Sequence, residues 1–156
     1  MIGRILAVDY GGRRTGLAVS DPLGIIASPL PPIVSESLDE TVAGVVAQVR
    51  ERAVRVVVVG MPYLPDGREG SAAQIVGIFL AALRPALPPQ VALLTRDERH
   101  TTHEARSLLR EGGYDRKRAK PLLDSVAAVV ILREYLGEIS RPPPPDEAPD
   151  DGTRLL

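Results

Sequence analysis

Three acidic residues, Asp9, Glu98 and Asp124, occupy positions at which their carboxylates could act together. Asp9 directly follows residues 5–8, an apolar run typical of a buried strand, and two glycines come soon after it. Glu98 follows another predicted strand, residues 91–95, and Asp124 lies in the first turn of a predicted apolar helix. Because the chain has no cysteine, a set of carboxylates favours a hard cation, Mg²⁺ or Mn²⁺.

A divalent cation at such a site suggests hydrolysis of a phosphodiester bond, because the cation can activate water and stabilise an in-line attack on phosphorus. Basic groups near the acids fit a phosphate partner. The residues expected to bind the nucleic-acid backbone are two hairpin glycines and seven cationic residues: Gly11, Gly12, Arg13, Arg14, Arg99, Arg116, Lys117, Arg118 and Lys120. In a plainer interpretation, Asp9 only accepts hydrogen bonds within a turn and the basic residues form a solvated helix face.

The choice of Glu98 over Asp97 depends on the predicted order of the strands. If residues 56–59 lie between the strand before Asp9 and the strand before Asp97, the acids begin about 10 Å apart, which is two strand spacings. Gly60, at the end of the middle strand, leaves room between them. A glutamate spans such a gap better than an aspartate, so Glu98 is the predicted ligand, and Asp97 is expected to form hydrogen bonds near Arg99.

The predicted elements describe an α/β domain with a five-stranded mixed sheet flanked by helices. Short turns join the first three strands, which are therefore antiparallel, whereas helices connect the first, fourth and fifth strands, which are therefore parallel. Strands are expected at residues 5–8, 15–19, 24–30, 56–59 and 91–95, and helices at residues 38–52, 71–84, about 102–111 and from 121 onward.

Several boundaries follow from single residues. Three prolines are expected to end the third strand at Leu30. Ser37 and Ser71 are predicted helix caps, and the second helix is expected to bury Ile75 among its apolar residues. Residues 116–120 are expected to form a basic connector, with Pro121 in the first turn of the last helix.

Length and composition indicate one domain over residues 1–139, followed by a tail. With 156 residues, of which 44% are hydrophobic and 25% charged, the chain can bury a sizeable core. From Ser140 onward it is rich in proline and carries four acids against two arginines, which predicts a disordered extension. It shows neither a cationic leader nor an apolar run of about 18 residues, so we expect a cytoplasmic protein with no membrane partner.

The formal net charge of −1 conceals a basic segment. Between Arg96 and Lys120 there are eight basic and five acidic side chains. This local excess is the feature expected for a nucleic-acid partner. With one Phe, four Tyr and no Trp, the chain has few rings on which bases could stack, so recognition of backbone and shape is expected.

Four motifs together resemble the YqgF/RuvX family: VDYGGRRTGLAVSD, VVGMP with DG downstream, DERHTTHEAR and LLDSVAAVVIL. They occur in this order between residue 1 and about residue 138. The resemblance implies an RNase-H-like fold and a metal-dependent nuclease, described in the family as processing the 5′ end of pre-16S rRNA in ribosome biogenesis and as a relative of Holliday-junction resolvases. Mapped by motif, the family's acidic positions fall on Asp9, Glu98 and Asp124. The proline in KRAKP departs from the family pattern, and the tail lies outside it.

Three classes of function remain open at this point. The first is a nuclease acting on precursor rRNA, with branched DNA as the alternative substrate; junction cutting would favour a twofold homodimer. The second is a nucleotide-binding module, because an Asp-x-Gly turn also occurs in actin-like and sugar-kinase folds, although those clasp nucleotide between two such domains. The third is a non-catalytic RNA-binding assembly factor, which would use the basic residues without the acids.

Overall fold

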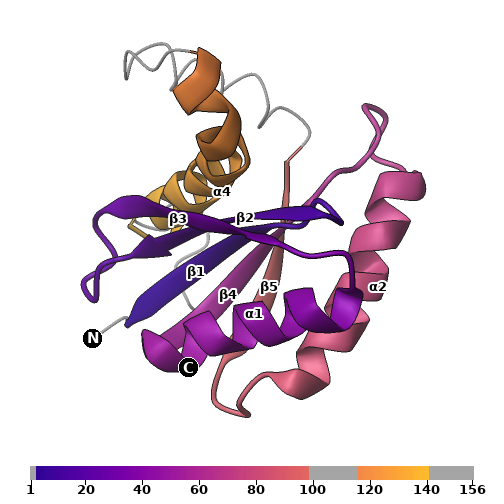
Figure 1. Cartoon of the computed structure of the whole chain (residues 1–156). Coiled ribbons are helices and arrows are strands. Elements are labelled where there is room, and N and C mark those ends of the chain that lie inside the picture. The colour runs from indigo at the N-terminus through magenta and orange to yellow at the C-terminus, as the bar shows by residue number, and fades with distance from the viewer. Residues whose placement is uncertain (1–2, 99–115, 141–156) are drawn as a thin grey trace, which may run out of the picture.

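The structure, a computed structural model, describes residues 3–98 and 116–140, with the backbone alone for residues 116–124. Its centre is a five-stranded sheet in the order β3-β2-β1-β4-β5 (Figure 1). The strands are β1 (Arg4–Asp9), β2 (Arg14–Ser20), β3 (Ala27–Val34), β4 (Val54–Met61) and β5 (Ala92–Asp97). Strands β1, β2 and β3 are antiparallel neighbours, and β1, β4 and β5 are parallel. The predicted mixed sheet, with β4 between β1 and β5, is confirmed.

Helices cover both faces of the sheet (Figure 1). Helices α1 (Leu38–Glu51) and α2 (Ser71–Ala86) lie on one face, and α4 (Arg116–Ser140) lies on the other. Ser37 caps α1 as predicted, because its hydroxyl accepts the amide of Glu40 at 3.0 Å. Since strand side chains alternate between faces, Leu6 and Val8 pack toward α1 and α2, whereas Ile5 and Ala7 pack toward α4.

The third strand begins and ends later than the predicted residues 24–30 and includes its prolines. β3 runs from Ala27 to Val34 and contains Pro29, Pro31 and Pro32. Among the described strands it is an edge strand, with β2 as its neighbour. At an edge, a proline whose missing amide hydrogen faces solvent removes no ladder bond, and the β2–β3 register shifts between Thr15 and Leu17, opposite Pro31 and Pro32. The expectation that these prolines end the strand was therefore wrong.

Helix α2 departs from the prediction in its cap and in one core position. Gly70 occupies the cap position without a side-chain hydrogen bond, and Ser71 is the first helical residue. Ile75 is 53% exposed, because the buried stripe of the helix passes through Val76, Phe79 and Leu83. Ile75 is one position off that stripe, about 100° around the helix.

The last helix begins earlier than expected. Residues 116–120, predicted to be a connector, belong to α4, and Pro121 lies inside this helix. Arginine, lysine and alanine are strong helix formers, which favours helix on the N-terminal side of the proline. The helix predicted near residues 102–111 lies outside the described residues. Ser140 is the last residue of α4, and the rest of the predicted tail also lies outside them.

In the part of the chain that the structure describes, no helix is both long enough and apolar enough to cross a membrane.

Candidate active site

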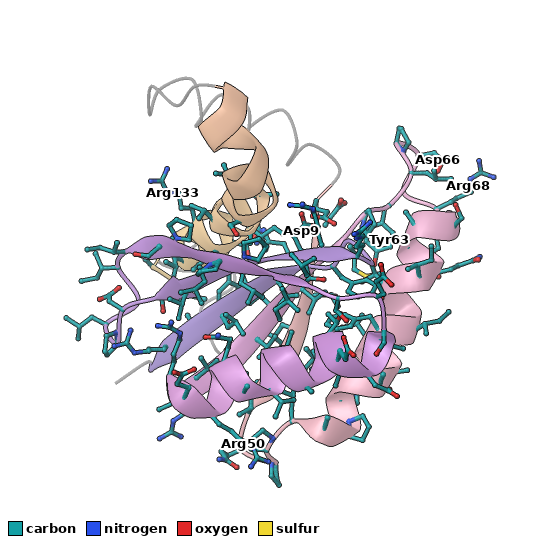
Figure 2. All side chains as sticks on the ribbon, viewed as in Figure 1. Asp9, Arg50, Tyr63, Asp66, Arg68 and Arg133 are labelled. Atoms are coloured by element: carbon teal, nitrogen blue, oxygen red, sulfur yellow. The ribbon has the colours of Figure 1, made fainter. Side chains whose placement is uncertain are left out.

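Asp9, Gly60 and Arg96 lie side by side at one edge of the sheet. Val8 pairs with Val59, so the next residues along β1 and β4 are Asp9 and Gly60. Gly60 in turn pairs with Arg96 of β5. This is the carboxyl edge of the three parallel strands, where α/β sheets commonly bind ligands. Asp9 lies at this edge, and Arg50 lies at the far side of the molecule (Figure 2).

Glu98 folds back over the end of β4. Its backbone N–H donates to the carbonyl of Met61 at 3.0 Å. Its carboxylate occupies the space above Gly60: a Cβ added to Gly60 would lie 2.6 Å from Oε2 of Glu98 and 2.7 Å from Cδ1 of Ile131 in α4. Any side chain at position 60 would therefore displace Glu98 or α4. The prediction that Gly60 leaves room for Glu98 is confirmed.

The carboxyl groups of Asp9 and Glu98 are in hydrogen-bonding contact. Asp9 continues the strand alternation of Ile5 and Ala7, so its side chain is on the α4 face of the sheet, where Glu98 also lies. The pKa of Glu98 is raised from 4.5 to about 8, first by burial, and then by the charge of Asp9, the hydrogen bond with Asp9 and the charge of Asp97. At neutral pH Glu98 therefore keeps a proton that it can donate to Asp9.

Asp124 belongs to α4, the helix that covers this pair, but its side chain is outside the described set. By helical spacing, position 124 falls on the same face as Ala128 and Ile131, which are both fully buried against the sheet. Ile131 lies beside Gly60, and so beside Glu98. Among the residues whose side chains are described, acids and histidines do not form a group of three that could hold a metal ion.

A buried hydroxyl fixes the part of α4 that carries Asp124. Ser125, fully buried, donates its Oγ hydrogen to the backbone carbonyl of Leu30 in β3 at 2.6 Å. Our reading of the sequence missed this positioning residue. Its signal is a serine at the start of the apolar helical run 126–132, where a buried hydroxyl needs a partner.

Arg96 holds the other half of α4 and does not belong to an open basic surface. Its guanidinium lies 3.0 Å from Glu134 and 2.5 Å from Glu138, and its side chain is 21% exposed. Arg96 is one of the eight basic residues counted between Arg96 and Lys120, but its charge is paired with two carboxylates within the fold. The signal for its actual role is the pair of glutamates four residues apart on the last helix.

The hairpin after Asp9 presents the predicted arginines to solvent. Arg13 and Arg14 are exposed, and Gly12 has a φ of +71°. Gly11 is required for a different reason: a Cβ there would clash with the carbonyl oxygen of Arg14. Arg13 lies 3.9 Å from Glu36, but both side chains are more than 70% exposed, so this ion pair contributes little to stability.

Tyr10 anchors the hairpin to the opposite layer of the fold. Its ring stacks on Phe79 of α2, with centroids 4.3 Å apart and an interplanar angle of 6°. The backbone carbonyl of Arg13 accepts the amide of Ser35 at 2.9 Å, which ties the hairpin to the segment before α1. Between these contacts lies a hollow of about 310 Å³, lined by Tyr10, Gly12, Arg13 and residues 35–38. The hairpin is therefore a supported structure next to the acidic pair.

The loop between β4 and α2 projects from the same edge (Figure 2). The predicted turn at Asp66 and Gly67 is confirmed, since Gly67 has a φ of +87° and its amide donates to the carbonyl of Leu64 at 2.8 Å. Asp66 forms an ion pair with Arg68 at 2.5 Å. Asp66 is thus held within its own loop.

The remaining predicted contacts to nucleic acid stay predictions. Arg99 lies outside the described residues. Four basic residues lie in the first turns of α4, where only the backbone is described: Arg116, Lys117, Arg118 and Lys120.

Comparison of the sequence with protein families finds a match over residues 3–138 to the model of RuvX, described as a Holliday junction resolvase. A protein of Synechococcus sp. (strain JA-3-3Ab), named "Putative pre-16S rRNA nuclease", is 42% identical over 133 residues, which cover 85% of this chain and 82% of the relative. A protein of Syntrophus aciditrophicus with the same name is 35% identical over 147 residues, or 94% of this chain and 97% of the relative.

Solved structures show the same fold at low identity. A fowlpox virus resolvase in complex with Holliday junction DNA matches with a TM-score of 0.58 and 11% identity, covering 88% of this chain and 99% of the viral protein. Thermus thermophilus RuvC in complex with a Holliday junction substrate matches with a TM-score of 0.54 and 20% identity, covering 88% and 96%. The predicted RNase-H-like fold class is confirmed.

Proposed function

Because this chain belongs to the RuvX family, described as Holliday junction resolvases, we propose that it is a divalent-metal-dependent nuclease that hydrolyses phosphodiester bonds in the 5′ region of pre-16S rRNA. The observation that carries the proposal is the partly buried pair Asp9 and Glu98 at the carboxyl edge of the parallel strands. Such a substrate would place the chain in the cytoplasm.

The two carboxyl groups of Asp9 and Glu98 are suitable ligands for a divalent cation. Two carboxyl groups that share one proton in a partly buried place repel each other once both are ionised, as the raised pKa of Glu98 indicates. Asp9 and Glu98 would hold Mg²⁺ or Mn²⁺, with Asp124 as the third ligand. When bound, the cation supplies Lewis-acid stabilisation of a phosphoryl oxygen and a water of lowered pKa.

The other residues near the edge have roles in binding and orientation. Gly60 keeps the space that the Glu98 carboxyl occupies. Arg13 and Arg14, exposed on the hairpin, would bind phosphates on either side of the scissile bond, and the backbone amides of Gly11 and Gly12 add uncharged donors. Arg99 and the basic first turns of α4 would extend this contact along the strand.

RNA is the favoured substrate because relatives that are 35–42% identical over most of their length carry the name pre-16S rRNA nuclease. Junction DNA is the second candidate, which the family description supports. A four-way junction has twofold symmetry, so cutting it would favour a homodimer with one acidic pair in each copy.

The test is cleavage by the Asp9→Asn variant. Wild-type chain with Mg²⁺ or Mn²⁺ is assayed on precursor rRNA, single-stranded RNA and a four-way DNA junction. We expect cleavage of the precursor to fall at least about 10³-fold in Asp9→Asn, because the site loses a carboxylate ligand of the divalent cation, while binding persists. Asp66→Asn, a carboxylate in the exposed loop at the same edge, is the control and should cleave normally.

Each outcome separates the candidate functions. Cleavage of the DNA junction in place of the RNA would select the second candidate. Full cleavage by Asp9→Asn would refute the role of the acidic pair. A wild-type chain that binds precursor rRNA and cleaves none of the substrates would be a non-catalytic assembly factor.

A further inference from the structure

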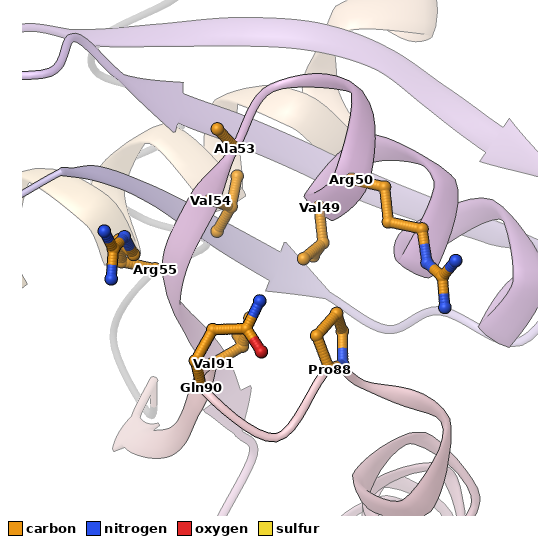
Figure 3. Close-up of a pocket in the computed structure, with 8 residues that line it drawn as sticks. All are labelled: Val49, Arg50, Ala53, Val54, Arg55, Pro88, Gln90 and Val91. Atoms are coloured by element: carbon orange, nitrogen blue, oxygen red, sulfur yellow. The ribbon is translucent and has the colours of Figure 1, made fainter.

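A basic surface lies at the amino edge of the sheet, where the parallel strands β1, β4 and β5 begin. A hollow of about 400 Å³ opens there, between the end of α1, the beginning of β4 and the segment before β5. Its polar lining consists of Arg50, Arg55 and Gln90, and the rest is apolar or backbone. The two guanidinium groups flank the hollow from opposite sides, and the amide of Gln90 lies between them (Figure 3).

The charge around this hollow is strongly positive. Residues 50–55 contain three arginines and one acid, Glu51, and Arg4 of β1 pairs with Val54 at the same edge. Arg50 and Arg55 are exposed, and neither takes part in the ion pairs that the described residues form. Their charges are therefore available to an anionic partner.

The walls of the hollow have a defined shape. Gly3 packs directly on the stem of Arg55, since a Cβ at Gly3 would lie 2.5 Å from Cγ of Arg55. On the other side, the amide of Val91 donates to the carbonyl of Pro88 at 3.0 Å and closes a turn. Ala53, which joins α1 to β4, has a φ of +53°. A charged surface on a supported backbone loses less conformational entropy when it binds a partner.

The hollow at the amino edge lies beside the first residues of β4, and the acidic pair lies beside Gly60 near the end of the same strand. An eight-residue strand is about 26 Å long, so a short duplex at the acidic pair does not reach Arg50 or Arg55. We propose that this amino-edge surface is a second phosphate-backbone contact, which binds a part of the nucleic-acid substrate remote from the scissile bond. The inference rests on the proposed function and adds to it that the substrate is a large folded nucleic acid that contacts both edges.

The experiment compares binding of a long and a short nucleic acid. Arg50→Gln, Arg55→Gln and the double variant are made in the full chain on the Asp9→Asn background, so that nothing is cleaved. Binding to a precursor rRNA transcript and to a six-base-pair RNA hairpin, whose A-form stem is shorter than β4, is measured between 50 and 200 mM salt. The matched control is Arg133→Gln, which removes the same charge from an exposed position on α4.

We expect the double variant to bind the transcript at least about 10-fold more weakly at low salt, with a slope of log K against log salt reduced by about 1.5, the amount for two lost phosphate contacts. Hairpin binding should be unchanged, as should transcript binding by Arg133→Gln. Transcript binding that is equal in the double variant and in the control would overturn the inference, and so would an equal loss on the hairpin. Failure of the proposed function would appear separately, as absent cleavage by the wild-type chain.

Discussion

The contact between Glu98 and Gly60 makes a glycine at position 60 part of the site. A methyl group there would overlap the carboxylate of Glu98 and the end of Ile131. We expect Gly60→Ala to lower the cleavage rate at least about 100-fold, because Glu98 is pushed away from Asp9, and to destabilise the fold by about 1–3 kcal/mol. Cleavage assays and thermal unfolding of the purified variant measure both effects.

The control for this variant is Gly77→Ala in α2. An added Cβ there meets nothing within 4 Å, so alanine should stabilise the helix by up to about 1 kcal/mol and leave cleavage unchanged. A Gly60→Ala chain that is as active as wild type would show that the observed position of Glu98 is not needed for cleavage.

The raised pKa of Glu98 predicts a dependence of stability on pH in the metal-free protein. Because the folded state binds the proton of Glu98 more tightly than the unfolded state does, the stability that this proton provides is complete below pH 4.5 and is lost as the pH rises through about 8. Glu98→Gln removes the titrating group. We expect wild type to lose about 1–3 kcal/mol more than Glu98→Gln between pH 5 and pH 9 in a chelator.

Urea unfolding at a series of pH values measures this difference. Asp66→Asn serves as the control, because Asp66 is in an exposed loop. If the curves of wild type and Glu98→Gln were parallel over this range, Glu98 would not hold a proton in the folded state.

At the scale of elements, α4 is fixed to the sheet at two points on either side of the acidic pair. Ser125 binds the carbonyl of Leu30 on β3, and Arg96 of β5 binds Glu134 and Glu138. We expect Arg96→Gln to destabilise the fold by about 1–2 kcal/mol, because it leaves the partly buried Glu134 and the exposed Glu138 without their cation. It should also slow cleavage, since α4 carries Asp124.

Thermal unfolding of Arg96→Gln and of Arg133→Gln tests this anchor. Arg133 lies on the exposed side of the same helix, and its replacement should change the free energy of unfolding by less than about 0.5 kcal/mol. Equal stability of the two variants would mean that the ion pairs of Arg96 do not hold the helix.

Most elements could be predicted because their signals are local. The apolar runs before Asp9 and Gly60 predict two parallel strands. The predicted order of these strands places Gly60 between Asp9 and Glu98, where it leaves room for the glutamate. Two features could not be predicted because they depend on tertiary position. The prolines of β3 are tolerated because that strand is at the edge, and Arg96 finds its glutamates 38 and 42 residues further along the chain. Neither fact is visible in a short window of sequence.

At the scale of the whole molecule, binding of the cation should appear as global stability. A ligand that binds only the folded state at 100 times its dissociation constant stabilises by about 2.7 kcal/mol. For a chain of this size we expect Mg²⁺ or Mn²⁺ at saturation to raise the Tm by about 5–10 °C near pH 8. Asp9→Asn and Glu98→Gln should lose most of this shift, and Asp66→Asn should keep it.

This measurement does not depend on any nucleic-acid substrate. A cation that raises the Tm of wild type and of Asp9→Asn equally would bind somewhere other than the acidic pair. Calcium can be compared in the same series to separate occupation of the site from support of cleavage.

The prolines of β3 also affect whether two molecules can pair through this edge strand at high protein concentration. Three of the eight residues of this outer strand have no amide hydrogen, so an incoming strand finds carbonyl acceptors but a broken row of donors. Continuous edge-to-edge growth of sheets from one molecule to the next is therefore disfavoured on this side. The same prolines that interrupted the sequence pattern protect a concentrated stock of the protein from aggregating through that edge.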